Sequence, residues 1–269
     1  MQAPETFGII AGNGVYPKEL ALAARRAGVK RIVAAAFTNE TDPALAEQVD
    51  TIEWLRVGQL ARLLKYFRQQ DVRHAVMAGQ IAPRNLFDLH PDWKALLLLA
   101  RLKQRNAESI FGGIATELEN AGTQLLPATT FLQDAIATSG LLAGPKLSRR
   151  QQTEIEFGWN IAKEIARLDI GQTVVIKNGT VLAIEGLDGT NETIRRGGRL
   201  AGTGAIMIKV SKPNQDMRFD VPVIGLETVR VAHEAGVRVI AIEADRTLLL
   251  KKTAIVEQAN RAQISIAGR

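Results

Sequence analysis

Two segments of the chain carry side chains of the types that bind phosphate groups and metal ions. The first contains Lys209, Lys212, Gln215, Arg218 and Asp220 and lies between two apolar runs. Because a buried, unpaired charge is costly, we expect these side chains at a strand end or in a loop. Lysine and arginine hold phosphate oxygens, whereas a carboxylate holds a metal ion or orients a water molecule. A solvated loop with local ion pairs is the alternative interpretation.

The second segment contains Glu185, Asp188, Gly189 and Thr190, and Arg196 follows it on a predicted helix. Two carboxylates, a glycine and a threonine at the start of a helix can bind a metal ion, a phosphate or both. The alternative is that Asp188 or Thr190 is only the residue that caps this helix.

A glycine turn near the amino terminus is a third candidate site. Gly12, Asn13 and Gly14 follow a short apolar strand and precede a helix that begins at Pro17. Backbone N–H groups at such a turn can bind phosphate. The dinucleotide fingerprint requires a glycine where Pro17 stands, so this turn does not predict a dinucleotide site. A tight turn without a ligand is the alternative interpretation.

The chain after this turn continues to alternate between strands and helices, which predicts a parallel sheet. Gly79 and Arg84 lie in the loop that follows the apolar strand predicted at 75–78. In an open α/β sheet, ligands bind outside the carboxyl ends of the strands. Arg84 is therefore a candidate phosphate or base contact, and a surface arginine is the equally simple alternative.

A change of pattern near Gly144 predicts the domain boundary, because glycine and proline interrupt the periodicity there. Ser148 with Gln151 forms a capping-box signal for the next helix. Beyond it, Asn178-Gly179 separates two apolar runs, which predicts a hairpin. We expect the last helix, at 251–263, to end the chain. The predicted fold is α/β with two domains: a Rossmann-like βαβ sheet at 1–144 and a mixed α/β domain at 145–269.

The composition narrows the class of partner. The chain of 269 residues has a net charge of +6, which favours nucleic acid, phosphorylated ligands or an anionic membrane surface. Only 5% of the residues are aromatic, which weakens the case for a binder of single-stranded nucleic acid. There is no cysteine, so disulfides and thiolate chemistry are excluded. We also expect neither a spanning helix nor a signal peptide.

Four stretches occur in order and extend over nearly the whole chain. They read Gly-Ile-Ile-Ala-Gly-Asn-Gly-Val-Tyr-Pro at 8–17, Asp-Ile-Gly-Gln at 169–172, Ala-Ile-Glu-Gly-Leu-Asp-Gly-Thr-Asn-Glu-Thr-Ile-Arg-Arg at 183–196, and Lys-Pro-Asn-Gln-Asp-Met-Arg-Phe-Asp-Val-Pro-Val-Ile-Gly at 212–225. Together they resemble the LpxI-type UDP-2,3-diacylglucosamine pyrophosphatases of lipid A biosynthesis. The sequence departs from the family pattern in having Asn13 where glycine often occurs and Asn191 where an acid can stand.

The resemblance implies a Mg²⁺-dependent hydrolase on the inner face of the cytoplasmic membrane. It would cleave UDP-2,3-diacylglucosamine to UMP and 2,3-diacylglucosamine 1-phosphate, called lipid X. It also implies an amino-terminal UDP-binding domain, a carboxyl-terminal lipid X-binding domain, and catalysis in a cleft between them. Asp220 stands at the critical carboxylate of the family's Arg-x-Asp-x-Pro motif.

With the resemblance, the residues of the candidate segments take expected roles. Asp220, Arg218 and Lys212 are the expected catalytic residues, and Asp220 with Glu185 or Asp188 would hold Mg²⁺. The expected substrate-binding residues are Gly12, Asn13, Gly14, Gly79, Arg84, Gln172, Gly189, Thr190, Arg196, Lys209 and Gln215.

Two other function classes use the same features. A non-catalytic sensor of a phosphorylated ligand would have the same charges, and a nucleic-acid-binding protein would explain the basic charge alone. We expect no nucleic-acid partner, a cytoplasmic protein in peripheral contact with anionic membrane, and possible pairing into a homodimer.

Overall fold

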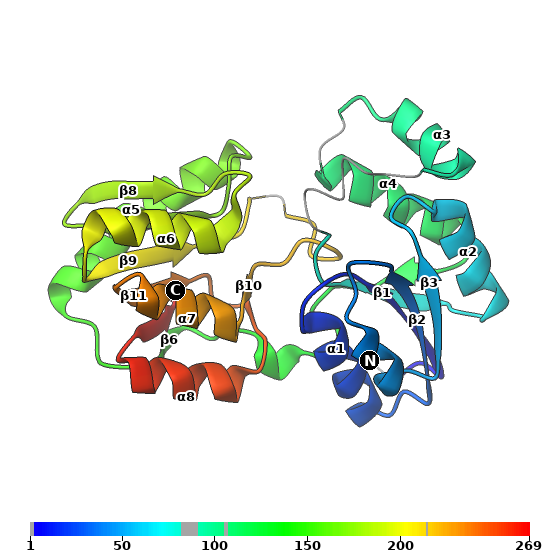
Figure 1. Ribbon diagram of the computed structural model, residues 1–269, viewed down its shortest axis with the longest axis horizontal. Helices are drawn as coiled ribbons and strands as arrows, with labels where there is room; N and C mark the ends of the chain where they lie inside the picture. The colour runs from blue at the N-terminus through cyan, green and yellow to red at the C-terminus, as the bar shows by residue number, and fades with distance from the viewer. Residues whose placement is uncertain (1–2, 82–90, 105–106, 214) are drawn as a thin grey trace. The chain divides into compact units, whose positions relative to one another are not determined.

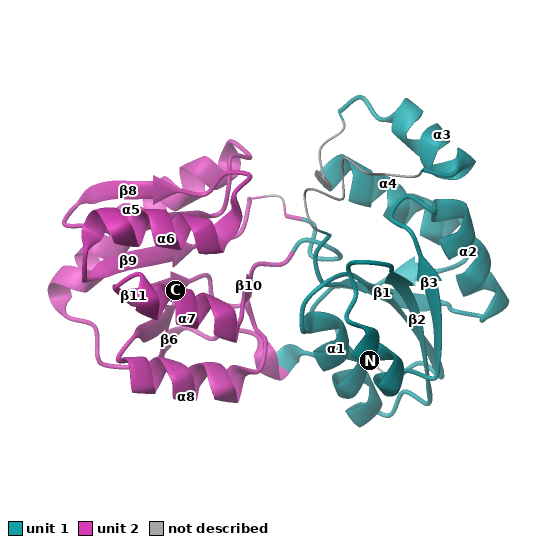
Figure 2. Cartoon of the chain, viewed as in Figure 1, with its two compact units in different colours: residues 1–133, 216–220 teal, residues 134–215, 221–269 magenta. Residues whose placement is uncertain are grey.

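The computed structural model describes residues 3–81, 91–104, 107–213 and 215–269. The chain divides into two compact units (Figures 1 and 2). Unit 1 comprises residues 1–133 and 216–220, and unit 2 comprises residues 134–215 and 221–269. The predicted α/β fold with two domains is confirmed, because each unit has its own sheet and its own helices.

Unit 1 contains a five-stranded parallel sheet in the order β3-β2-β1-β4-β5. Strands β2 and β3 lie on one side of β1, whereas β4 and β5 lie on its other side. The strand order therefore reverses between β1 and β4. The loops that follow these two strands therefore border the switch point, where ligands bind in open α/β sheets. The strands are β1 (Thr6–Ala11), β2 (Arg31–Phe37), β3 (Thr51–Leu55), β4 (His74–Ala78) and β5 (Gln124–Leu125).

Helices bury the unit 1 sheet. Helix α2 turns Leu60, Leu63, Leu64 and Phe67 toward the sheet, as their helical spacing predicts. Asp92 caps α3 by accepting hydrogen bonds from the N–H groups of the first turn. The helices are α1 (Tyr16–Arg26), the short 3-10 helix η1 (Pro43–Gln48), α2 (Leu60–Gln69), α3 (Trp93–Arg101) and α4 (Ala107–Asn120).

A segment from late in the chain, residues 216–220, also belongs to unit 1. Phe219 packs against the core that α4 helps to form, with its ring centroid 5.7 Å from that of Phe111. The N–H of Ala128 donates to the carbonyl oxygen of Met217 at 2.8 Å. Part of the charged segment 209–220 is thus held by the amino-terminal unit.

Unit 2 contains a six-stranded mixed sheet in the order β6-β13-β11-β9-β7-β8. Strands β9, β11 and β13 are parallel to one another, and β7 is antiparallel to both β8 and β9. The strands are β6 (Gly140–Ala143), β7 (Thr173–Lys177), β8 (Thr180–Ile184), β9 (Ala205–Lys209), β11 (Val237–Ile242) and β13 (Ser265–Gly268), with a separate pair β10 (Val223–Ile224) and β12 (Leu248–Leu249).

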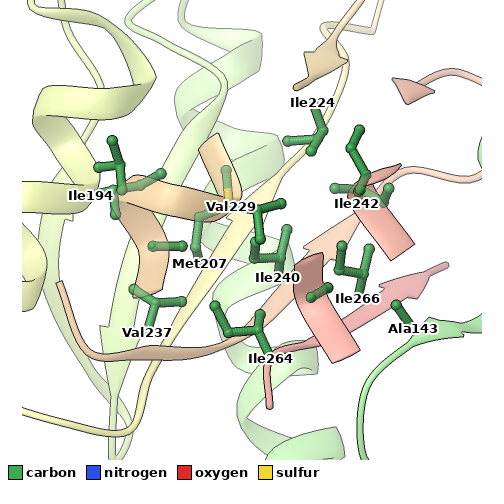
Figure 3. Packing of buried hydrophobic residues seen from close by; sticks show 14 of the residues in the cluster. Ala143, Ile194, Met207, Ile224, Val229, Val237, Ile240, Ile242, Ile264 and Ile266 are labelled. Carbon is green, nitrogen blue, oxygen red and sulfur yellow. The ribbon is translucent and has the colours of Figure 1, made fainter. Parts of the chain in front are cut away.

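Both faces of the unit 2 sheet are buried. Met207 and Ile240 point into a core formed with α6 (Gly189–Ala201), α7 (Leu226–Glu234) and α8 (Lys252–Ala262), as Figure 3 shows. The alternating neighbours, such as Ile206 and Val239, point to the opposite face and pack against α5 (Arg149–Arg167). The period of two along each strand therefore produces a three-layer unit.

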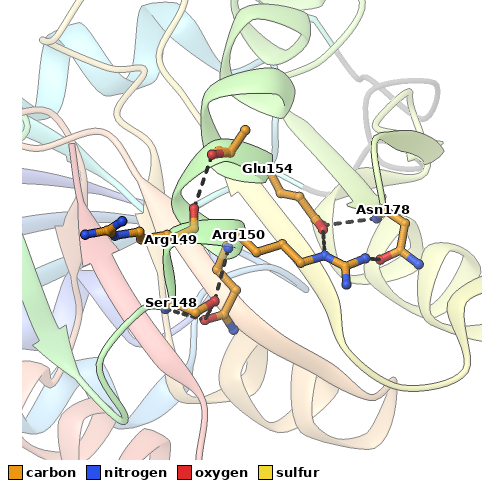
Figure 4. A network of polar contacts seen from close by, with 7 residues as sticks. Ser148, Arg149, Arg150, Glu154 and Asn178 are labelled. Carbon is orange, nitrogen blue, oxygen red and sulfur yellow. Dashed lines mark hydrogen bonds and ion pairs between the residues drawn. The ribbon is translucent and has the colours of Figure 1, made fainter.

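A polar network ties the start of α5 to the β7–β8 hairpin (Figure 4). Ser148 and Gln151 form the predicted capping box. The Arg150 guanidinium donates to Glu154 and to the Asn178 side chain, and the Asn178 N–H donates to Glu154. Asn178 and Gly179 both have positive φ, as a two-residue hairpin turn requires. These local predictions are confirmed.

Two local predictions in this region are wrong. The last helix does not end the chain, because β13 follows it and pairs with β11 and with β6. The stretch around Gly144, predicted as an irregular boundary, contains β6. Both strands have four residues, too few for a clear alternating pattern, and their partners lie far away in the sequence.

Candidate functional site

One edge of the unit 2 sheet gathers the polar residues that the sequence analysis singled out. Lys209 ends β9, and Thr173, its register partner, begins the antiparallel strand β7. Glu185 follows β8, which runs antiparallel to β7 and so ends at the same edge. The topology thus places Lys209, Thr173 and Glu185 side by side, at the same end of three neighbouring strands.

Hydrogen bonds join these residues to the first turn of α6. The Lys209 ammonium donates to the hydroxyl oxygen of Thr190 at 2.6 Å and, more weakly, to that of Thr173 at 3.4 Å. The Thr190 hydroxyl donates to Glu185 Oε1 at 2.7 Å, and the Gln172 N–H donates to Glu185 Oε2 at 3.1 Å. The structure therefore brings together Lys209, Thr190, Glu185 and Gln172.

The Glu185 carboxylate is ionised at neutral pH despite its partial burial. Burial by itself would raise its pKa. The positive charge of Lys209 and hydrogen bonds from Thr190, Thr173 and Gln172 outweigh that cost, so the pKa lies below its ordinary value. Glu185 therefore places a negative charge beside Lys209.

Asp188 lies in a separate arrangement on the β8–α6 loop. One of its oxygens accepts from the Gly186 N–H at 3.0 Å, and the other pairs with the Arg196 guanidinium. Arg196 also donates to the carbonyl oxygen of Ile184 at 2.6 Å. Asp188 precedes Gly189, the first residue of α6, but its side chain makes no capping hydrogen bond to the helix. The alternative of a simple side-chain cap is therefore wrong for Asp188.

Lys212 and Gln215 form a tight turn after β9. The Gln215 side-chain oxygen accepts from the Lys212 N–H at 2.7 Å, and the Lys212 ammonium pairs with Asp169. Gln215 is buried, and its side-chain nitrogen has no hydrogen-bond partner within the described residues. A buried donor without a partner is costly, which makes Gln215 a candidate ligand contact.

A second network at the same sheet edge was not singled out from the sequence. Glu243, which directly follows β11, accepts from the Ser211 N–H at 2.7 Å, from the Ser211 hydroxyl at 2.8 Å and from the Lys163 ammonium at 2.6 Å. This carboxylate holds the backbone between Lys209 and Lys212. The signal that could have found it is an acidic residue immediately after a buried strand, as at Glu185.

Arg218 and Asp220 lie in the part of the charged segment that packs on unit 1. The Arg218 guanidinium donates to both carboxylate oxygens of Asp216, at 2.8–3.2 Å, and to Glu119 on α4 at 2.9 Å. These hydrogen bonds lower the pKa of Asp216 against the effect of its burial. Asp220 is half-buried, and its N–H donates to the Asp216 carbonyl oxygen at 3.0 Å. Arg218 therefore acts in this structure as a clamp between the segment and α4.

The two glycine turns of unit 1 are brought together, as the sheet topology predicts. The Gly12 N–H donates to Ala78 O and the Asn13 N–H to Gln80 O, each at 2.7 Å. A side chain on Gly79 would meet Asn13 O at 2.5 Å. Two N–H groups of the predicted phosphate-binding turn are thus engaged by the neighbouring loop, whereas Gly14, at φ +91°, faces open space. Arg84 lies outside the described residues.

The expected metal ligands are divided between the two units. Glu185 and Asp188 belong to unit 2, and Asp220 belongs to unit 1. Within the ranges that the structure describes, no group of three or more His, Cys, Asp or Glu side chains could hold a metal ion. The carboxylates of Glu185 and Asp188 each accept hydrogen bonds through both oxygens and have a cationic neighbour, Lys209 or Arg196.

Comparison with known proteins covers almost the entire chain. The model of the LpxI N-terminal domain matches residues 6–135, and that of the LpxI C-terminal domain matches residues 138–267. UDP-2,3-diacylglucosamine pyrophosphatase LpxI of Caulobacter vibrioides is 27% identical over 97% of this chain and 96% of its own length. A crystal structure of N5-carboxyaminoimidazole ribonucleotide synthetase with ADP aligns with a TM-score of 0.29 and 14% identity, over 71% of this chain and 40% of the other, a similarity too weak to inform the fold. The two domain models, in their order and over their full span, show that this chain belongs to the LpxI family.

Proposed function

We propose that this protein hydrolyses the pyrophosphate bond of UDP-2,3-diacylglucosamine to UMP and 2,3-diacylglucosamine 1-phosphate (lipid X). The observation that carries the proposal is the similarity to the Caulobacter protein of that name along nearly the full length of both chains. In the reaction, water adds to one phosphorus while the bridging oxygen leaves with the other, so the products are two phosphate monoesters.

The site supports this chemistry through its charges. Cleaving a pyrophosphate requires neutralisation of both phosphates and a positioned water. Lys209 and Lys212 lie at one sheet edge of unit 2 and carry ammonium groups that can donate to phosphate oxygens. Asp220 is the carboxylate for which we propose the catalytic role, because it stands in the Arg-x-Asp-x-Pro stretch, 218–222, on which the resemblance to the family rests.

We also propose that activity depends on Mg²⁺, held by Asp220 together with oxygens of the substrate. Mg²⁺ retains several waters and needs only one or two protein carboxylates when phosphates are present. Glu185 and Asp188 fit this role poorly, since Lys209 and Arg196 already compensate their charges. Bound Mg²⁺ would supply further neutralisation of the phosphates.

A diacylated substrate resides in a membrane, so we propose a cytoplasmic protein in peripheral contact with an anionic bilayer. Helix α3 offers the contact surface. Trp93, Leu96 and Leu97 lie on one helical face and are 63%, 54% and 48% exposed. The basic residues Arg101 and Lys103 follow at its carboxyl end and are exposed. An apolar face with cations beside it is typical of helices that lie on membranes. None of the described helices has the length and apolar character needed to cross a bilayer.

The test is release of UMP from purified UDP-2,3-diacylglucosamine by the purified protein, with Mg²⁺ and with EDTA. We expect turnover with Mg²⁺, its loss in EDTA and its return when Mg²⁺ is added in excess. Binding of the substrate without UMP release would instead establish a sensor of the phosphorylated ligand. Turnover that persists in EDTA would disprove the metal dependence but leave the hydrolase intact.

A further inference from the structure

Lys209 is an unusual cation in this protein because it is almost entirely removed from water. Of the lysines and arginines in the described ranges, it alone is buried, with 7% of its surface exposed. A buried ammonium is costly unless it is hydrogen-bonded and paired with a negative charge. Its hydroxyl partners Thr190 and Thr173 are neutral, so the compensating charge must come from further away.

The hydrogen-bond chemistry identifies the source of that charge. A threonine hydroxyl has a single hydrogen, and a carboxylate can only accept. The Thr190 hydroxyl therefore donates its hydrogen to Glu185 Oε1, and the two oxygens lie 2.7 Å apart. A lone pair of the Thr190 oxygen then faces the Lys209 ammonium nitrogen, 2.6 Å away. The Gln172 N–H fixes the other oxygen of Glu185. This series of hydrogen bonds therefore fixes the orientation of the Glu185 carboxylate and of the Thr190 hydroxyl beside Lys209.

We propose that Glu185 and Thr190 are positioning residues, which hold the Lys209 ammonium in the orientation that reaches the substrate phosphate. This inference rests on the proposed function and replaces the expected role of Glu185 as a metal ligand. Lys209 has three N–H donors. The bonds given by the described residues use one for Thr190 and a long one for Thr173, so the third remains for a phosphate oxygen.

The first experiment is a double-mutant cycle on kcat/KM for UMP release. E185Q keeps the shape of Glu185 but removes its charge, and K209M removes the ammonium. We expect E185Q to lower kcat/KM by about tenfold to a hundredfold, and to have less than about a threefold effect when added to K209M, since the two act as a unit. Thr190→Val should resemble E185Q, and Thr190→Ser, which restores the hydroxyl, should recover most of the activity that Thr190→Val loses.

The matched control is E243Q. Glu243 is also a partly buried carboxylate that accepts from an ammonium at the same sheet edge, but its partner is Lys163. Its effect on kcat/KM should multiply with that of K209M rather than vanish in that background. An effect of E185Q that is equally large with and without Lys209, together with a higher Mg²⁺ concentration for half-maximal activity, would overturn the proposal in favour of a metal ligand.

A second measurement does not depend on turnover. In protein labelled with ¹⁵N-lysine, the hydrogen-bonded Lys209 ammonium should give a slowly exchanging NMR signal, identified by its absence in K209M. We expect E185Q and Thr190→Val to shift or broaden this signal and Thr190→Ser to retain it. An unchanged signal in E185Q would refute the positioning role. Absence of UMP release by the wild type, with the signal behaving as expected, would refute the proposed function alone.

Discussion

The N–H of Asn13 donates to the carbonyl oxygen of Gln80 at 2.7 Å, which joins the loop after β1 to the loop after β4. The two loops approach so closely that neither Gly12 nor Gly79 has room for a side chain. The two loops are thus packed against each other at the switch point of the unit 1 sheet. The glycines of this turn therefore serve loop packing, in addition to any contact with a ligand.

Gly79→Ala should destabilise unit 1 by about 2–4 kcal/mol, the sum of a left-handed backbone and a steric clash. The control is Gly28→Ala, at a similar φ of +95° but with no atom within 4 Å of the added carbon, as compared with 2.5 Å at Gly79. It should cost only about 1–2 kcal/mol. Urea unfolding of the two variants checks this prediction. Equal losses in the free energy of unfolding would contradict the close packing of the two loops.

Asp220→Asn should abolish most turnover while leaving the fold intact. In the proposed role of metal ligand or base, Asp220 would act mainly in the transition state, so kcat should fall by at least about a hundredfold and substrate binding should change little. Glu257→Gln, an exposed change on α8 where Glu257 pairs with Arg261, is the control for a lost carboxylate. Near wild-type kcat in Asp220→Asn would rule out the catalytic assignment.

Arg218→Lys should loosen the segment 216–220, although it retains the positive charge. A lysine cannot reproduce the paired bonds that the guanidinium makes to Asp216 while also reaching Glu119. We expect a lower kcat and faster proteolytic cleavage next to this segment. Arg230→Lys, on the surface of α7 with two glutamate partners, is the matched control. The clamp role fails if both variants are cleaved at the same rate as the wild type.

Unit 2 should lose stability in acid through Glu243. Burial tends to raise the pKa of Glu243, but Lys163 and Ser211 together lower it below its ordinary value of 4.5. The charged form is thus favoured by folding, so this contribution is complete above pH 4.5 and is lost as the pH falls through the lower folded-state pKa.

E243Q should therefore cost about 2 kcal/mol at pH 7, and the difference from the wild type should shrink below pH 4. Chemical unfolding of both proteins across pH 3–7 measures this difference. Glu227→Gln, where the carboxylate pairs with Arg230 on an exposed face, should cost much less at pH 7. A difference that is constant with pH would mean that Glu243 stabilises the unit without its charge.

The apolar face of α3 should mediate membrane contact. Replacing Trp93, Leu96 and Leu97 by serine removes the exposed apolar surface while keeping the core contacts of α3, such as Ala95. We expect wild-type protein to float with vesicles that contain anionic lipid and the triple variant to stay in solution. Replacing the exposed Leu200 on α6 by serine is the control.

High salt distinguishes the electrostatic part of this membrane contact from the apolar part. It should weaken flotation by screening the basic side chains, each of which contributes about 1 kcal/mol near an anionic surface. Flotation of the triple variant at wild-type level would place the membrane contact elsewhere on the protein.

Local sequence signals were sufficient to predict several elements of the fold. The hairpin turn at Asn178-Gly179 and the capping box of Ser148 lie at their predicted positions, and the strand predicted at 75–78 is β4. These signals depend on backbone preferences and on periodicity within a few residues, so the chain carries them before any tertiary contact forms. The charged residue types and their clustering likewise predicted candidate positions for the chemistry, which remain a prediction.

Only the tertiary structure decided which charges are paired. Arg218 meets Glu119, which is 99 residues away, and Lys209 meets Thr173 and Thr190 from other elements. The placement of β13 between β6 and β11, and of residues 216–220 on unit 1, has the same origin. Contacts of this kind depend on which strands and loops share an edge, and a sequence pattern of short period contains no information about distant partners.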